Sequence, residues 1–114
     1  MSLVDEVINS LIVELKRGTM VLLVLSQLHT NEYGYSLVKK LEDKDIQIEA
    51  GTLYPLLRRL EKQKLLISEW DTSENRPRKY YTLSEDGKIV FKQIKKEWEK
   101  MSKILGEILE EEEK

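Results

Sequence analysis

Two clusters of cationic side chains are the part of this sequence whose residue types and spacing suggest a chemical function. Arg58, Arg59 and Lys62 form the first cluster, and the stretch Asn75-Arg76-Pro77-Arg78-Lys79 contains the second. Arginine and lysine bind phosphate groups, and arginine also reads guanine in the major groove of DNA. A proline in the second cluster limits the freedom of its loop, so less conformational entropy is lost when the arginines engage phosphate. Together the clusters favour binding of DNA.

The distribution of charge supports this interpretation more than the net charge does. The net charge is -2, but residues 50–82 carry seven basic and four acidic side chains, and both flanks are net acidic. A basic middle between acidic flanks is typical of a local anion-binding face. Scattered solubilising charge could produce the same excess by chance. Whether the basic side chains form one face depends on the helices and strands that carry them.

Nothing in the sequence favours an enzyme, a cofactor or a metal site. The absence of cysteine excludes disulfides, thiol nucleophiles and thiolate zinc sites. His29 has no second histidine near it, and the carboxylates Glu42 and Asp43 lie in a polar stretch without apolar surroundings. Neither a Gly-rich phosphate loop nor a supported Ser/His/Asp arrangement is present.

The length and composition of the chain predict one small folded domain in the cytoplasm. Its 114 residues are 40% hydrophobic and 35% charged, which is not the composition of a disordered chain. The longest apolar run, Met20 to Leu25, is too short to cross a membrane, and no signal sequence opens the chain.

Hydrophobic spacing predicts helices over residues 3–16, 20–28, 33–41 and 50–63. In the last of these, four leucines form a narrow apolar stripe: Leu53, Leu56, Leu57 and Leu60. The opposite face and its flanks then carry Gly51, Thr52, Tyr54, Pro55, Arg58, Arg59 and Lys62. There glycine permits close backbone approach to DNA, and the polar side chains can bind phosphate or a base. Any amphipathic surface helix also turns its charges outward, so this helix alone does not establish DNA binding.

The periodicity changes after residue 63. Residues 66–70 and 78–83 are rich in β-branched and aromatic side chains, and a polar loop that contains Pro77 separates them. This pattern predicts a β-hairpin whose shoulder carries the second cationic cluster. Ser84 is a predicted N-cap for one long helix that reaches about residue 112.

The long helix carries a heptad seam. Ile94, Trp98, Met101, Leu105 and Ile108 are spaced four and three residues apart. A domain this small cannot cover a helix of roughly 28 residues, or ~40 Å, so we expect homodimerisation, with Val7 and Leu11 packing nearby. Two Trp98 side chains across the two-fold axis could sandwich a planar aromatic effector. The alternative is that Trp98 only anchors the interface.

The order of these elements is that of a winged helix-turn-helix, in which the third helix enters the major groove and the hairpin "wing" touches the backbone. The sequence also resembles the PadR-type transcriptional regulators. Gly51-Thr52-Leu53-Tyr54-Pro55-Leu56-Leu57-Arg58-Arg59-Leu60-Glu61 is similar to their recognition helix, and Arg76-Pro77-Arg78-Lys79-Tyr80-Tyr81-Thr82-Leu83 to their wing. Tyr33-Gly34-Tyr35 is a third similarity.

The resemblance covers roughly residues 17–112 and implies a homodimeric repressor of the short subfamily, with a single C-terminal dimerisation helix. Thr52, Tyr54, Pro55 and Arg58 match the recognition-helix positions, and Arg76, Arg78 and Lys79 match the wing. The sequence departs from the family's pattern at three places, all of which affect local backbone geometry. Asn75 replaces a glycine of the wing, Lys64 replaces a C-cap glycine, and Glu49-Ala50 replaces a Ser-Pro-like helix start.

We therefore expect a mainly α-helical protein with a small β-hairpin, in three parts. Residues 1–16 form a dimer-associated helix, 17–83 the winged helix-turn-helix, and 84–114 the dimerisation helix. Its partners are a double-stranded DNA operator, a second copy of the chain and a small aromatic ligand that releases the repressor. Two alternatives are a protein-binding winged-helix module without specific DNA binding and a multidrug-binding sensor dimer.

Overall fold

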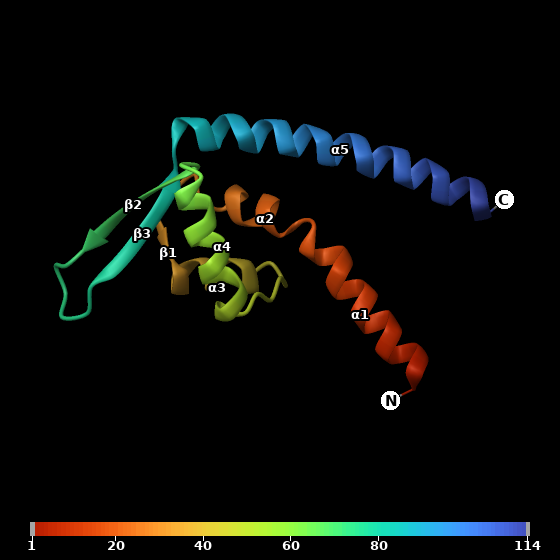
Figure 1. The fold of residues 1–114 in the computed structure, drawn as a ribbon, viewed down its shortest axis with the longest axis horizontal. Helices are drawn as coiled ribbons and strands as arrows, with labels where there is room; N and C mark the ends of the chain where they lie inside the picture. Colours follow the sequence, from red (N-terminus) through yellow and green to blue (C-terminus); the bar gives the residue numbers. More distant parts are fainter. Residues whose placement is uncertain (1, 114) are drawn as a thin grey trace.

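The chain folds into five helices and three strands within residues 2–113, which a computed structural model describes (Figure 1). In chain order these are α1 (Leu3–Arg17), α2 (Met20–Ser26), β1 (Glu32–Tyr33), α3 (Gly34–Glu42), α4 (Ala50–Lys62), β2 (Leu66–Asp71), β3 (Arg78–Leu83) and α5 (Glu85–Glu113). The prediction of a mainly helical winged-helix fold with a β-hairpin is confirmed. No helix within residues 2–113 is long and apolar enough to cross a membrane.

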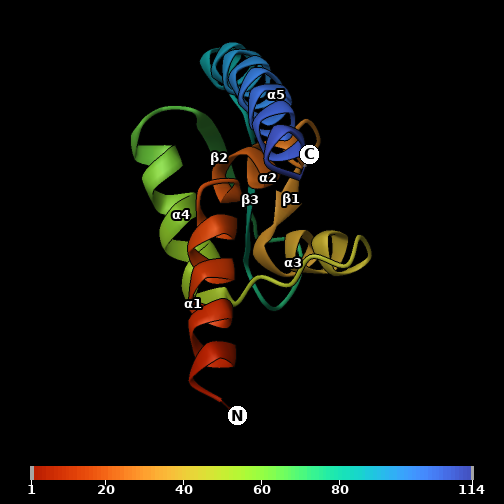
Figure 2. The same cartoon turned by 90° about the vertical axis from the view of Figure 1, so that its right-hand side faces the viewer.

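The molecule is elongated, with principal-axis extents of 59 × 37 × 24 Å. A winged-helix body made of α2, α3, α4 and the sheet occupies one end, and α1 and α5 extend away from it (Figure 1). Figure 2 views the molecule from the side toward which these two helices extend, with the sheet behind them. The hairpin projects from the opposite end of the body.

Leucine side chains from α2, α3 and α4 build most of the core. The predicted apolar stripe of α4 is confirmed, because its four leucines are the buried residues of that helix. Three strand residues close the core from the sheet side: Leu66, Tyr81 and Leu83. The helix α2 is partly enclosed, since two of its seven residues, Val24 and Leu25, are buried.

The sheet has one strand that the sequence did not reveal. Its order is β1-β3-β2, with antiparallel pairing throughout, and β1 pairs Glu32 with Tyr81 and Tyr33 with Tyr80. A strand of two residues is too short to show a period of two, so the sequence gives no signal for it. β2 and β3 pair from Leu66–Leu83 at the core to Asp71–Arg78 at the tip. The sheet therefore places the loop 72–77 at the far end of the hairpin.

Helix ends follow some predicted signals and not others. Ser84 caps α5 as predicted, because its Oγ accepts the N–H of Gly87 at 2.9 Å. Thr19, a residue type that often caps helices, precedes α2 but makes no cap bond to it; its hydroxyl donates to the carbonyl of Lys16 at 2.9 Å. Glu49 likewise makes no side-chain cap bond to α4.

Lys64 and Asn75, which stand where the family has glycine, differ in backbone conformation. Lys64 adopts φ 65°, the left-handed conformation that a C-cap glycine would take, so the turn after α4 closes as in the usual motif. The only other non-glycine residue with positive φ in the described part of the chain is Asp45, so Asn75 turns the wing loop without it. The α4–β2 turn is also tied to α5, since the Ser84 hydroxyl donates to the Lys64 carbonyl at 2.8 Å.

Candidate nucleic-acid interface

The exposed face of α4 carries all the side chains predicted for it. Burial of the four leucines fixes the rotation of the helix about its axis, and the remaining residues therefore face solvent. These exposed residues are Gly51, Thr52, Tyr54, Pro55, Arg58, Arg59 and Lys62. Pro55 lies inside the helix and has no N–H to donate to the carbonyl of Gly51. The first turns of α4 therefore present backbone as well as side-chain polar groups.

The cations of the wing differ in how tightly the fold holds them. Arg76 is exposed in the loop, whereas Arg78 is half-buried. The Arg78 guanidinium lies 4.6 Å from the centroid of the Tyr33 ring and 4.0 Å from the carboxylate of Glu74. A hydrogen bond with Tyr80 is the largest cause that raises the pKa of Arg78, and the electrostatic interaction with Tyr33 adds to it. The fold thus preorganises Arg78 at the hairpin shoulder.

Lys79 is held by an ion pair inside the protein. Its Nζ donates to Oε1 of Glu61, in the last turn of α4, at 2.9 Å, and lies 5.4 Å from the centroid of the Tyr81 ring. Glu61 also accepts a hydrogen bond from the hydroxyl of Ser68. These contacts lower the pKa of Glu61, with Ser68 as the larger cause, and the bond to Glu61 raises the pKa of Lys79. The charge of Lys79 is therefore balanced in the unbound protein.

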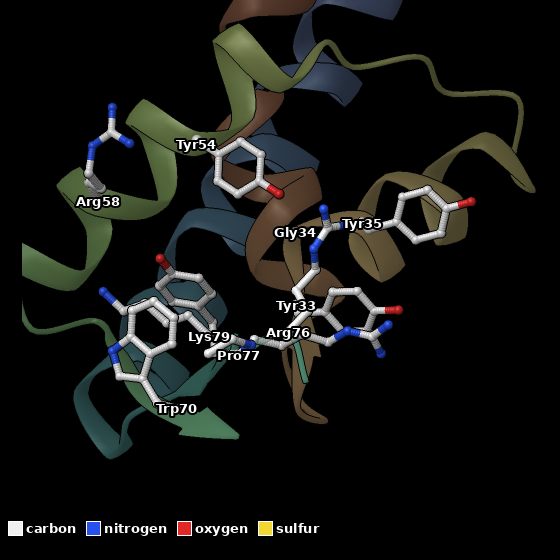
Figure 3. Close-up of a pocket in the computed structure, with 11 residues that line it drawn as sticks. Tyr33, Gly34, Tyr35, Tyr54, Arg58, Trp70, Arg76, Pro77 and Lys79 are labelled. Atoms are coloured by element: carbon white, nitrogen blue, oxygen red, sulfur yellow. The ribbon is translucent and has the colours of Figure 1, made fainter. Parts of the chain in front are cut away.

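The two cationic clusters meet around one cavity of about 650 Å³ between α4, the hairpin and the start of α3 (Figure 3). Tyr54 and Arg58 reach it from α4, and four consecutive wing residues reach it from the other side: Arg76, Pro77, Arg78 and Lys79. Gly51, Thr52, Pro55, Arg59 and Lys62 do not line the cavity and extend the exposed face of α4 beyond it. The fold therefore joins two sequence-distant clusters into one surface.

Four aromatic residues of this surface were missing from the predicted site. Tyr33, Tyr35, Trp70 and the buried Tyr81 also line the cavity, and Tyr35 and Trp70 are 61% and 64% exposed. The rings of Tyr33 and Tyr35 stack at 6.4 Å between centroids. The motif Tyr33-Gly34-Tyr35 was the available signal for two of them, whereas the position of Trp70 follows from strand register, which the sequence does not specify.

A small polar cluster fixes Tyr33 at this edge of the cavity. The backbone N–H of Tyr33 donates to Ser36 Oγ at 3.0 Å, and Ser36 Oγ donates to Glu32 at 2.7 Å. Lys40 pairs with the same carboxylate at 2.9 Å. Burial alone would raise the pKa of Glu32, but the hydrogen bonds from Lys40 and Ser36 lower it. This cluster joins β1 to α3 directly beneath the aromatic side of the cavity.

A second, apolar groove of about 650 Å³ lies between the α1–α2 junction and α5. The predicted seam residues Ile94, Trp98, Met101 and Leu105 line it, together with Leu15 and Leu22 among others. Val7 and Leu11 do not line it; they lie farther along α1, where no residue is buried. The seam is thus uncovered along α5, and Trp98 is 47% exposed.

Neither surface contains residues arranged for metal binding. Among residues 2–111, whose side chains the structure describes, no group of three or more His, Cys, Asp or Glu could hold a metal ion. His29 packs edge-on against Phe91, with 5.1 Å between the ring centroids.

Comparisons with known proteins agree with this geometry. The Transcriptional regulator PadR-like family matches residues 21–93. The crystal structure of a PadR family transcriptional regulator from Eggerthella lenta is 50% identical, with a TM-score of 0.88 over 93% of this chain and 95% of that one. A PadR family regulator from Clostridium difficile is 30% identical, with a TM-score of 0.73 over 80% and 98%.

A similarity in sequence extends to a named regulator as well. The transcriptional regulator Rv3488 of Mycobacterium tuberculosis is 30% identical over 95 residues, which are 82% of this chain and 89% of that protein. Members of the matching family are transcriptional regulators and not enzymes, and DNA binding is implied by that role. On the match over residues 21–93 and the likeness of the whole fold, this chain belongs to the PadR-like family of transcriptional regulators.

Proposed function

We propose that the protein is a homodimeric repressor that binds a pseudo-palindromic operator. In this proposal α4 of each subunit enters the major groove, and the wing grips the flanking backbone. The observation that carries it is the joint surface around the cavity, where Arg58 of α4 and Arg76 of the wing face the same space. Contacts of these cations with phosphate would supply much of the affinity and make it depend on salt. In this proposal the protein acts in the cytoplasm.

The uncovered seam supports the dimer. Half-exposed apolar residues run along α5 and along α1, and contiguous apolar surface of this kind is typical of an interface. A second copy would cover both helices, so residues 1–16 and 84–114 would act as dimerisation segments around the DNA-binding part, 17–83. A two-fold axis would set the two α4 helices about one DNA turn apart, roughly 34 Å.

A planar aromatic effector is the proposed signal for release. Trp98 lies in the apolar groove and is half-exposed, so that two copies could enclose a flat ligand between their indoles. Ligand binding there would change the spacing of the two α4 helices and weaken operator binding. We expect Trp98→Ala to abolish binding of planar dyes and to leave a dimer. Unchanged dye affinity would show that Trp98 only anchors the interface.

A reporter gene under the promoter of the protein's own gene tests the proposal in cells. The wild type should reduce expression, and Arg58→Ala combined with Arg76→Ala should restore it. Lys92→Ala combined with Lys96→Ala is the matched control, because it removes two exposed positive charges from α5 instead. Increased expression with the wild type would indicate an activator. Equal expression with all three proteins would favour the protein-binding module or the sensor dimer.

A further inference from the structure

We propose that Glu61 is a positioning residue that fixes the distance between α4 and the wing. The inference rests on the proposed DNA-binding function, because the distance matters only if both elements engage one operator. Glu61 itself would touch no DNA. It would act through Lys79 and Ser68, which belong to the two strands of the hairpin.

The contacts of Glu61 join three elements. From the last turn of α4, one carboxylate oxygen accepts a hydrogen bond from Lys79 of β3 at 2.9 Å. The other oxygen accepts the hydroxyl of Ser68 on β2. Beyond Ser68 the remaining residues of β2 are exposed, whereas Leu66 at its start is buried. Glu61 therefore contacts the hairpin at Ser68, beyond which β2 is no longer held by packing against the core.

The position of the Glu61 carboxylate is unfavourable for its own helix, α4. A carboxylate in the last turn of a helix interacts unfavourably with the helix dipole, whereas basic residues there interact favourably. α4 carries Arg59 and Lys62 in that turn, and these follow the expected pattern. The favourable interactions of Glu61 are those with the hairpin. Both members of the Glu61–Lys79 pair have side chains that are 30% exposed, so water screens the pair only in part.

A purely electrostatic role and a positioning role of Glu61 predict opposite changes in operator affinity when the carboxylate is removed. Glu61 lies beside a surface proposed to bind phosphates, so removing its negative charge should tighten DNA binding if charge alone matters. If Glu61 positions the wing, removing it should weaken operator binding in spite of the gain in positive charge. The sign of the change therefore separates the two roles.

The test measures binding of the intact dimer to operator and to competitor DNA by fluorescence anisotropy, at several salt concentrations. We expect Glu61→Gln to weaken operator binding about tenfold, within the range of coupling found in such networks, without weakening binding to competitor DNA. The control Glu69→Gln removes an exposed carboxylate from the same hairpin and should not weaken operator binding. The charge swap Glu61→Lys with Lys79→Glu should recover part of the loss, which a general loss of stability would not allow.

Lys79→Gln completes the test, because it separates positioning from direct phosphate contact. If Lys79 only positions the wing, the variant should bind operator more weakly, but the slope of log K against log salt concentration should not change. If Lys79 contacts a phosphate, the magnitude of that slope should fall by about 0.9. Operator binding by Glu61→Gln as tight as that of the wild type, or a reduced slope in Lys79→Gln, would overturn the inference. If the wild type itself does not distinguish operator from competitor DNA, the proposed function and this inference fail together.

Discussion

The ring of Tyr54 on α4 occupies the space that a side chain at Gly34 would fill. A Cβ built on Gly34 would overlap the hydroxyl end of that ring, and the Tyr54 hydroxyl points toward Gly34 (Figure 3). No glycine within residues 2–113 has a positive φ, so close approach and not backbone conformation requires glycine at this position. The first residue of α3 therefore sets how α4 lies against it.

Gly34→Ala should displace Tyr54 and weaken both the fold and operator binding. The overlap is with the outer end of the half-exposed Tyr54 side chain, so it should cost about 1 kcal/mol of unfolding free energy, the low end for overpacking, which urea denaturation can measure. Combining it with Tyr54→Ala should recover stability, because the smaller residue vacates the contested space. Equal stability of Gly34→Ala and the wild type would contradict the close approach.

Gly51→Ala should have the opposite effect on stability. Beyond the adjoining residues and the backbone of its own helix, no atom lies within 4 Å of a Cβ built there, and alanine is the better helix former by up to about 1 kcal/mol. Operator affinity should nevertheless fall, because the proposed interface brings the backbone of Gly51 close to DNA. A more stable variant with unchanged operator affinity would remove Gly51 from the interface. Circular dichroism melts and anisotropy titrations give the two quantities.

Trp70 should report DNA binding by its fluorescence. The chain has two tryptophans, so Trp98→Phe leaves Trp70 as the sole indole emitter. Trp70 is exposed beside the cavity, so operator binding should cover the indole and change its emission. We also expect Trp70→Ala to weaken operator binding, because the indole would lose its contact with the sugar-phosphate backbone. Unchanged emission at saturating operator would place DNA away from the hairpin.

Leu105→Glu should convert the dimer into monomers. The substitution puts a charge into the apolar groove along α5, where it would be buried without a partner by a second copy. Lys103→Glu is the control, because Lys103 is exposed and does not line the groove. Sedimentation velocity should give a monomer for the first variant and a dimer for the second. A dimer in both would mean that the copies associate through another surface.

Stability should decrease in acid, in part through Glu61. Its pKa is lower in the folded chain than its ordinary value, so its contribution is present above that value and is lost as the pH falls through the folded pKa. Unfolding free energies between about pH 6 and pH 3 should therefore fall less steeply in Glu61→Gln than in the wild type. The difference at neutral pH should be about 1 kcal/mol or less, since the pair is partly exposed. Parallel pH curves for the two proteins would show that Glu61 is not stabilised in the fold.

The sequence predicted those features that depend on local periodicity. The leucine stripe of α4 determines which face is exposed, so the side chains on that face could be named before the fold was known. The partner of Lys79 could not be predicted, because Glu61 lies 18 residues away and meets it only through the packing of α4 on the hairpin. The two-residue strand β1 has no period of its own. Its pairing with β3 is what places Tyr33 beside Arg78.

The most direct test of the central claim is an anisotropy titration with the DNA upstream of the protein's own gene, at two salt concentrations. The claim is that α4 and the wing form one DNA-binding surface. We expect nanomolar, strongly salt-dependent binding that competitor DNA does not displace. Arg58→Ala and Arg76→Ala should each weaken this binding. Weak binding that is equal for any DNA, and indifferent to both substitutions, would contradict the claim.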